Sequence, residues 1–308
     1  MLRFTLQRLL TGIPTLLVLI AIAFFLIRAA PGGPFDTERQ LAPEIEANMR
    51  AAYHLDEPLV QQFGRYLVNL ARGDFGPSFQ YREYTVTELI AAGFPVSVTV
   101  GGLAMLLAVV VGVALGTLAA LRQNSTADHA VMAAAMTGIS VPTFVTAPLL
   151  ILLLAVTLGW LPAGGYGDGG WRFLLLPVVT LALPQIACIA RLTRASMIEV
   201  LRSPYIRTAR AQGQRLHTIV LRHALKPAML PVVSYIGPAT AGVLTGSVVI
   251  EQIFGLPGVG RFFVNGALNR DYTLVMGVVV FYGALILLFN FLVDVVYGLL
   301  DPRIRHRT

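Results

Sequence analysis

The chain has 308 residues, of which 56% are hydrophobic and 13% are charged, and its formal net charge is +7. A soluble domain carries about 25% charged residues, so this composition excludes a disordered chain and argues against a soluble globular protein. The single cysteine, Cys188, excludes a disulfide framework or a thiolate metal site within the chain, and the single lysine, Lys226, precedes Pro227, which excludes the Gly-Lys-Ser/Thr sequence of a nucleotide-binding P-loop.

Six intervals lack Asp, Glu, Lys and Arg, and each reaches the ~18–20 residues that a helix needs to cross the hydrocarbon layer of a membrane. The third interval is too long for one span and barely fits two, and its last part, 161–167, is rich in proline and glycine. We therefore expect one span at about 130–157, followed by an external loop. The sequence predicts an all-α membrane protein with six transmembrane helices, from the intervals 9–27, 89–121, 130–167, 173–190, 227–250 and 272–293.

The first interval also has features of a secretory signal peptide, because Arg3 and Arg8 precede it. It is long for the apolar part of such a peptide, and Arg28 disrupts the small-x-small pattern of a cleavage site. We therefore interpret residues 1–30 as a retained transmembrane anchor.

Residues 31–93 follow the anchor and contain most of the acidic residues of the chain. Apolar residues repeat there at helical spacing after Pro58 and stop before the glycine-rich segment 73–78. This pattern predicts one amphipathic helix that packs on the membrane helices, with an apolar face of Leu59, Phe63, Tyr66, Leu67 and Leu70.

Two pairs of glycines stand four residues apart, Gly112 with Gly116 and Gly242 with Gly246. This spacing lets membrane helices approach closely.

The distribution of basic residues predicts how the chain crosses the membrane, because short cytoplasmic loops are enriched in Lys and Arg. One set of loops, 1–8, 122–129, 191–226 and 299–308, carries 14 basic and 3 acidic residues. The opposite set, 28–88, 168–172 and 251–271, carries 9 basic and 12 acidic residues. Both termini are therefore expected in the cytoplasm, and the +7 charge indicates topology and not nucleic-acid binding.

The loop 191–227 contains helix signals in a regular order. Ser203 suits an N-cap, and Pro204 suits the first helical position. The Ala-rich stretch to Gln212 is followed by Gly213, which can adopt the left-handed conformation that ends a helix. A second helix, at about 214–225, is expected to end at Pro227. The alternative is a basic loop that lies on anionic lipid. Arginines alone would suffice for that contact, so this alternative does not explain the caps, the alanines or the glycine.

The motifs of this loop and of several other segments resemble those of a known family. Residues 207–213 (RTARAQG), followed after nine residues by 223–228 (HALKPA), resemble the EAA loop of binding-protein-dependent ABC importer permeases in its peptide-transporter form. Further matches are 73–79 (GDFGPSF), 251–260 (EQIFGLPGVG), 265–272 (NGALNRDY) and 300–303 (LDPR). The resemblance covers essentially the whole chain and is closest to the B subunit of oligopeptide permeases.

The resemblance implies the type I ABC importer permease fold, in a bacterial inner-membrane subunit that is not itself an enzyme. Its implied partners are a second homologous permease in a heterodimer, two ABC ATPase subunits, a periplasmic or lipid-anchored peptide-binding protein and membrane lipid, and no nucleic acid. ATP and Mg would be bound by the ATPases, and this chain would bind no cofactor or metal. The implied organisation is an anchor (1–30), an external segment (31–93), a permease core (94–298, with later spans at about 96–121, 130–157, 173–190, 228–250 and 273–298) and a cytoplasmic tail (299–308).

Two groups of residues are expected to carry the function. The loop 191–227 would couple the permease to the ATPases, and the loop between the last two spans would form the external mouth that meets the binding protein or the arriving peptide. For the second group, the alternative of equal weight is a loop that only packs against the rest of the chain, because Gly-Pro clusters are common in ordinary turns. The expected coupling residues are Ser203, Tyr205, Arg207, Ala209, Arg210, Gly213, Arg215, His223, Leu225 and Pro227, and the expected mouth residues are Glu251, Phe254, Gly255, Pro257, Gly258, Arg261, Asn265, Arg270 and Asp271.

Other functions are compatible with parts of the sequence. Related permeases carry nickel chelates or cell-wall peptides, and a secondary transporter could use Asp294 or Glu199 for ion coupling. A secondary transporter would not need a capped docking helix. Asp168 lies in a Gly-x-Gly-Asp sequence like that of intramembrane aspartyl proteases, but Asp294 is expected on the opposite side of the membrane, too far away to share a proton with it.

Overall fold

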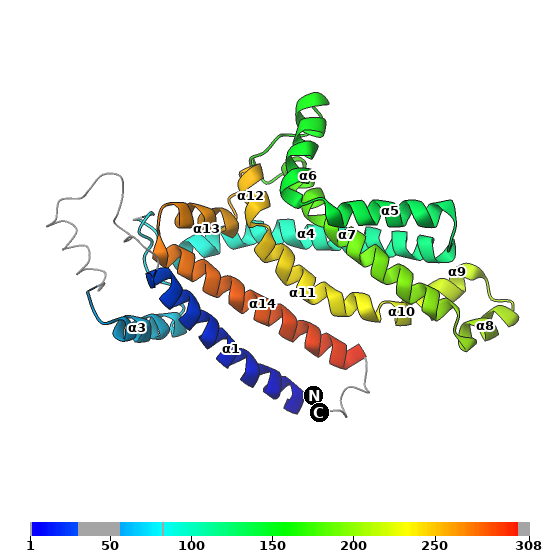
Figure 1. Cartoon of the computed structure of the whole chain (residues 1–308), viewed down its shortest axis with the longest axis horizontal. Helices are drawn as coiled ribbons and strands as arrows, with labels where there is room; N and C mark the ends of the chain where they lie inside the picture. The colour runs from blue at the N-terminus through cyan, green and yellow to red at the C-terminus, as the bar shows by residue number, and fades with distance from the viewer. Residues whose placement is uncertain (1, 30–55, 82, 301–308) are drawn as a thin grey trace.

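The structure is a computed structural model that describes residues 2–29, 56–81 and 83–300. Residues 30–55 of the predicted external segment and 301–308 of the predicted tail lie outside the described part. Helices dominate the described residues (Figure 1). Their bounds are α1 (Leu2–Ala29), α3 (Leu59–Ala71), α4 (Val86–Leu121), α5 (Thr126–Ser140), α6 (Thr143–Leu150), η1 (Ile151–Thr157), α7 (Trp171–Leu201), α8 (Pro204–Ala211), α9 (Leu216–Thr218), η2 (Ile219–Ala224), α10 (Leu225–Ala228), α11 (Leu230–Gly246), α12 (Val248–Phe254), α13 (Val259–Leu268) and α14 (Tyr272–Leu300).

Four of the described helices are long and apolar enough to cross a membrane by themselves, namely α1, α4, α7 and α14. Two bent helix pairs pass the same test, which gives up to six spans if each pair counts as one. This agrees with the six apolar intervals of the sequence.

The third predicted span is not one helix. The chain bends by 105° between Thr126–Ser140 and Thr143–Thr157, and α6 projects away from the bundle in which α5 lies (Figure 1). Pro142 stands at the bend as the N-cap of α6. The residue before a proline is pushed out of the α-helical conformation, so α5 ends there. Length and composition predicted the apolar segment but not its change of direction.

Pro227 does not end the helix before it, contrary to the sequence prediction. Segments α9, η2 and α10 form one helical run, which continues into α11 with a bend of 54°. The six residues of η2 are π-helical, with hydrogen bonds that span five residues. The fifth span is therefore joined directly to the predicted coupling loop.

The centre of the bundle is the contact between α4 and α7. A Cβ added at Gly112 would lie 2.8 Å from the Cβ of Ile189, and one added at Gly116 would collide with the carbonyl of Ala190. The close approach predicted for this glycine pair is therefore confirmed. It is not confirmed for Gly242 and Gly246, because a Cβ at either would meet nothing within 4 Å.

The amphipathic helix predicted after Pro58 is α3. Four residues of its predicted apolar face, Phe63, Tyr66, Leu67 and Leu70, pack on α1 and α14, where Phe24 and Phe63 have ring centroids 5.2 Å apart. Leu59, the fifth, is exposed. The buried centre of this cluster consists of Ile20, Phe24, Met276 and Val280.

Candidate functional site

The predicted coupling helix is α8, and its ends are formed largely as the sequence indicates. Pro204 occupies the first turn. Gly213 has a φ of +74°, and its N–H donates to the carbonyl of Arg210 at 3.0 Å, while the N–H of Gln214 donates to Ala209 at 3.2 Å. The left-handed stop is therefore confirmed. Ser203 is the N-cap by position, but its Oγ donates to the carbonyl of Val200 at 2.6 Å and accepts no N–H of α8.

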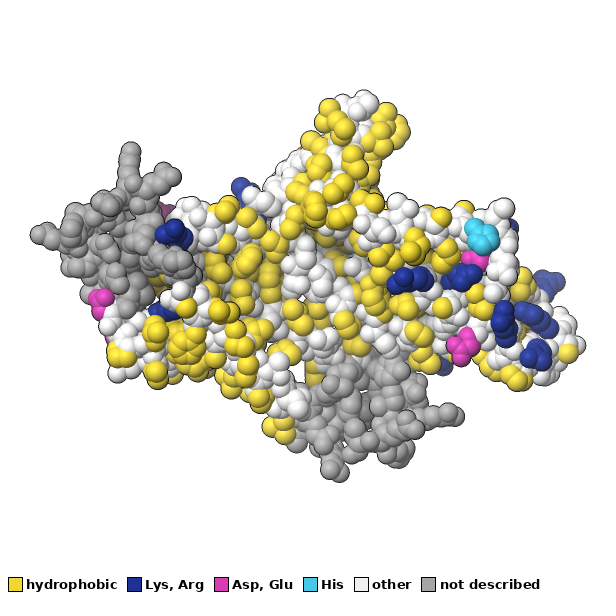
Figure 2. All heavy atoms as spheres, in the orientation of Figure 1, with side chains coloured by type: hydrophobic (Ala, Val, Ile, Leu, Met, Phe, Trp, Pro, Cys, Tyr) yellow, Lys and Arg dark blue, Asp and Glu magenta, His cyan; other side chains and the backbone are white. Residues whose placement is uncertain are grey.

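One face of α8 is fixed to its own chain. Ile206 and Ala209 are buried in a cluster with Met197 of α7 and with residues of η2 and α10. The small side chain of Ala209 therefore allows close packing inside this chain. The opposite face, which includes Tyr205, Arg207, Thr208 and Arg210, is exposed. Figure 2 shows Lys and Arg side chains gathered over this end of the molecule.

A hydrogen bond closes the turn that follows α8. The Nε2 atom of His223 on η2 lies 2.9 Å from Oε1 of Gln214, next to Gly213. It joins the end of α8 to the helical run that leads into α11. Leu225 and Pro227 lie partly buried in that run, and Arg215 is exposed at its start. The structure thus brings the ten predicted coupling residues together in one projecting unit.

An ion pair that the sequence did not predict joins α7, the helix that precedes α8, to α5. Nε and Nη2 of Arg194 donate to the two carboxylate oxygens of Asp128 at 2.5 and 2.7 Å. Asp128 is buried and also accepts the N–H of Asn124 at 2.9 Å. The sequence signal was the Ser125-x-x-Asp128 pattern at a helix start. Its partner, 66 positions away on α7, is decided by packing.

The predicted external mouth is folded around a buried carboxylate. Glu251 accepts the hydroxyl of Ser247 at 2.7 Å and the N–H of Gly260 at 2.8 Å, and it is fully buried. A Cβ added at Gly258 would collide with this carboxylate. The N–H of Val259 donates to Ser97 Oγ on α4 at 3.0 Å. These bonds hold the start of α13 against α12 and α4.

A second buried carboxylate, that of Asp271, joins two segments that the sequence comparison had matched separately. It accepts the hydroxyl of Ser78 and the N–H of Gln80. Asn265 of the same region donates from its amide to the Tyr81 hydroxyl at 3.4 Å. The segment 73–81 is therefore packed against the start of α14.

The nine predicted mouth residues differ in how far they are buried. Glu251, Phe254, Gly258 and Asp271 are buried, so their side chains and Cα atoms face the interior of this chain. Pro257 and Asn265 are partly buried, and Gly255, Arg261 and Arg270 are exposed. In this conformation, only the partly buried and exposed residues can meet another molecule.

Of the two carboxylates in the protease alternative, the structure describes the side chain of Asp168 alone. Asp168 accepts the nearby N–H of Gly170 at 3.1 Å in a turn. The side chain of Asp294 lies outside the described part. Within the described ranges, no group of three His, Cys, Asp or Glu side chains is placed to hold a metal ion.

Comparisons with known proteins agree with this architecture. Residues 112–306 match the family "Binding-protein-dependent transport system inner membrane component", and residues 1–101 match its N-terminal companion, "Binding-prot-dependent transport system membrane comp, N-term". The chain belongs to this family. It is an inner-membrane, multi-pass permease subunit, and the resemblance found in its loop sequences is confirmed.

Relatives cover the whole length. The oligopeptide transport system permease protein OppB of Salmonella typhimurium (strain LT2) is 57% identical over 306 residues, which cover 99% of this chain and 100% of the relative. The dipeptide transport system permease protein DppB of Bacillus subtilis (strain 168) is 43% identical over 305 residues, with 99% and 98% covered. A chain of the MetNI methionine ABC transporter, solved in inward-facing conformations, has a TM-score of 0.60 at 19% identity and covers 69% of this chain and 96% of its own. This last likeness confirms the type I importer fold alone.

Proposed function

We propose that this chain is one of two permease subunits of an ATP-driven importer that moves oligopeptides or dipeptides across the inner membrane into the cytoplasm. Its partners are a second homologous permease, two ABC ATPases that bind ATP and Mg, and a peptide-binding protein on the outer side. The names and full-length coverage of the relatives support peptide cargo over nickel chelates or cell-wall fragments.

The observation that carries the proposal is the asymmetry of α8. Ile206 and Ala209 anchor one face in the chain, while the arginine-bearing face projects beyond the bundle with no described element over it. A secondary transporter has no need of such a helix. Exposed guanidinium groups suit acidic side chains on a partner, which charge-assisted hydrogen bonds would hold.

The proposed orientation places α8 and both termini in the cytoplasm. It is supported by the 14 basic and 3 acidic residues of the loops on that side. The exposed mouth residues, Arg261 and Arg270 among them, then lie on the periplasmic side, where we assign the contact with the binding protein.

The continuity of the chain suggests how movement would be transmitted. A four-residue turn, 212–215, joins α8 to the run α9–η2–α10, which continues into α11, and the Arg194–Asp128 pair ties α7 to α5. A displacement of α8 by the ATPases would therefore move α7 and α11 as packed bodies. Such rigid-body movement is a known basis for switching between inward-facing and outward-facing states.

Site-specific crosslinking tests this assignment in the complete transporter. Arg210→Cys on α8 should crosslink to an ATPase subunit, and Arg261→Cys should crosslink to the binding protein. A membrane-impermeant thiol reagent applied to intact spheroplasts should label only the second variant. Labelling of Arg210→Cys from outside, or crosslinks to no ATP-hydrolysing subunit, would contradict the proposal.

A further inference from the structure

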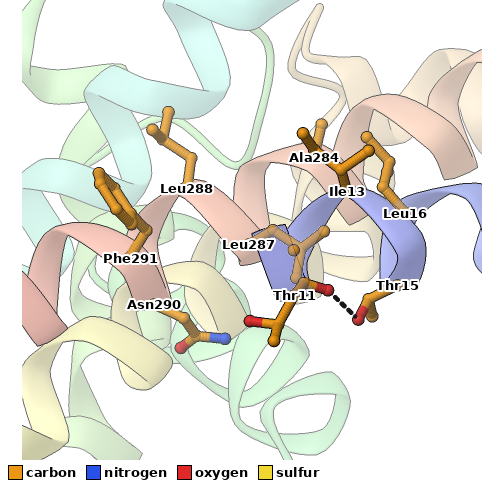
Figure 3. Close-up of a pocket in the computed structure, with 10 residues that line it drawn as sticks. Thr11, Ile13, Thr15, Leu16, Ala284, Leu287, Leu288, Asn290 and Phe291 are labelled. Atoms are coloured by element: carbon orange, nitrogen blue, oxygen red, sulfur yellow. Dashed lines mark hydrogen bonds between the residues drawn. The ribbon is translucent and has the colours of Figure 1, made fainter. Parts of the chain in front are cut away.

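Polar side chains at membrane depth usually face a polar partner, a water-filled cavity or a substrate path. The hollow between α1 and α14 includes Asn290, but its walls are mostly apolar, as at Leu287 and Phe291 (Figure 3). A different place, between α7 and α11, carries polar side chains from two helices that bond to each other. This second place has the chemistry of a binding site.

A hydrogen bond between two membrane helices forms the centre of this place. The hydroxyl of Tyr235 on α11 donates to Oε1 of Gln185 on α7 at 2.7 Å. Arg191 of α7 is near enough to this hydroxyl to act on it electrostatically, and Cys188 lies beside it. Gln185 and Arg191 stand three residues before and after Cys188, so they flank it within roughly 120° of the circumference of α7. We call Gln185, Arg191 and Tyr235 the polar cluster.

The polar cluster has hydrogen-bonding capacity that no described residue uses. Oε1 of Gln185 accepts the Tyr235 hydroxyl, but the amide N–H groups of Gln185 donate to no atom of the described part. Arg191 is exposed and forms no ion pair or hydrogen bond with the described residues, whereas Arg194, three residues later, is paired with Asp128. Unpaired donors against hydrocarbon are costly, so this side of α7 should face water or a polar substrate.

The depth of the polar cluster follows from the length of α7. Gln185 lies 14 residues after Trp171, the first residue of α7, which is roughly 21 Å along the helix. Arg191 lies roughly 30 Å along it, at the far edge of a hydrocarbon layer about 30 Å thick. In the proposed orientation, Gln185 is therefore in the cytoplasmic half of the membrane and Arg191 is at its cytoplasmic edge.

The exposed side of α11 connects the polar cluster to the external mouth. Pro238, Gly242 and Gly246 follow Tyr235 by 3, 7 and 11 residues, so they share its side of the helix, and all three are exposed. A Cβ added at either glycine would meet nothing within 4 Å. Helix α11 runs between α7 and α14 (Figure 1) and is followed by α12, the first helix of the mouth. A strip without long side chains therefore leads from the mouth to the cluster.

We propose that this side of α7 and α11 lines the path of the transported peptide and that the polar cluster binds the peptide as it passes. The Gln185 amide donates to a backbone carbonyl of the peptide, and Arg191 binds its terminal carboxylate nearer the cytoplasm. Backbone and terminal groups are common to all peptides, so these contacts accept peptides of different sequence. The strip along α11 leaves room for their side chains. The inference rests on the proposed function, which supplies the peptide.

The chemistry of the polar cluster favours a peptide over lipid or a helix of the second permease. Acyl chains would leave the Gln185 amide without an acceptor. A partner helix could pack on Gly242 and Gly246, but it would have to supply both an acceptor for Gln185 and a carboxylate for Arg191. A peptide supplies a backbone carbonyl and a carboxylate in every molecule.

Thiol accessibility tests the proposal in the complete transporter in proteoliposomes. Gln185→Cys is made together with Cys188→Ala, so that the new thiol is the single one of this subunit. A charged methanethiosulfonate reagent, which enters only aqueous spaces, should modify it, and turnover with the binding protein, peptide and ATP should slow this modification about threefold or more. The control is Val110→Cys with Cys188→Ala, at an exposed apolar position of α4. It should react with an apolar maleimide but not with the charged reagent.

A second measurement isolates the contact of Arg191. Uptake of one peptide is compared with uptake of the same peptide amidated at its C-terminus, each relative to the unchanged transporter. Arg191→Gln should lower uptake of the free acid about fivefold and leave uptake of the amide close to that of the unchanged transporter. Arg191→Lys, which keeps the charge, should restore most of the uptake of the free acid. An arginine that only stabilises the helix end would affect both peptides equally.

Three results would overturn the proposal. They are modification of Gln185→Cys by the apolar maleimide alone, a crosslink from position 185 to the second permease, and an equal effect of Arg191→Gln on the free acid and the amide. The uptake comparison provides the test if Gln185→Cys fails to fold. Modification by the charged reagent requires neither peptide nor ATP, so its absence in a transporter that still takes up peptide leaves the proposed function standing. An unchanged transporter that is modified but takes up no peptide would contradict the proposed function instead.

Discussion

The hydroxyl of Ser78 donates a 2.5 Å hydrogen bond to the carboxylate of Asp271, although the two residues are 193 positions apart. The other oxygen of the same carboxylate accepts the N–H of Leu274 at 3.0 Å, in the first turn of α14. Asp271 is fully buried. One side chain thus fixes the external segment before α4 to the beginning of the last span.

Removing the Asp271 carboxylate should therefore destabilise the external end of the bundle. Asp271→Ala leaves the Ser78 hydroxyl and two backbone N–H groups without their acceptor, at a cost of about 1–3 kcal/mol. The measurement is thermal unfolding of the purified protein in detergent. Asp168→Asn is the control, because Asp168 bonds only within its own exposed turn, and it should unfold as the unchanged protein does. Equal midpoints for both variants would show that the Asp271 contacts do not support the fold.

Gly213→Val should uncouple ATP hydrolysis from transport. The φ of +74° disfavours a β-branched residue, so the end of α8 should rearrange and its exposed face should turn. We expect ATPase activity to persist while peptide uptake into proteoliposomes falls about tenfold or more. Gly159→Val is the matched control, since Gly159 has a φ of +64° in a loop remote from α8. Normal uptake by Gly213→Val would refute the coupling role of α8.

A methyl group at Gly258 should be poorly tolerated. It would collide with the Glu251 carboxylate and lie 2.8 Å from Ser97 Oγ, which displaces two buried hydrogen-bonding groups. Gly258→Ala should therefore lower stability by about 1–3 kcal/mol. Gly246→Ala, within a helix and with nothing near the added Cβ, should be neutral or stabilise the protein by up to about 1 kcal/mol. The measurement is thermal unfolding of both variants in detergent. A midpoint for Gly258→Ala at or above that for Gly246→Ala would contradict the prediction.

The ion pair between Arg194 and Asp128 can be examined by a double-mutant cycle. Arg194→Leu leaves a buried carboxylate without its partner, and we expect the free energy of unfolding to fall by about 3–5 kcal/mol. Adding Asp128→Leu removes the unpaired carboxylate and should recover part of that free energy. The exposed Arg65–Glu57 pair is the control, because surface pairs contribute about 0–1 kcal/mol. No recovery in the double variant would mean that the Asp128 charge is not the source of the loss.

Local chemistry explains which features could be predicted. Gly213 needs no distant contact to end α8, and the spacing from Leu59 to Leu70 defines an apolar face whatever the helix packs against. The apolar intervals follow from composition alone. The family could likewise be assigned from short sequences such as RTARAQG, because they are contiguous in the chain.

The sequence by itself therefore determined the class of protein, the number and position of its apolar segments and the stop at the end of α8, since each depends on residues a few positions apart. Only the tertiary structure decided that Ala209 faces inward, that Glu251 and Asp271 are interior acceptors and that α5 and α6 part at 105°. Which buried acceptor meets which donor is set by packing between helices that are distant in the chain. No local pattern specifies that choice.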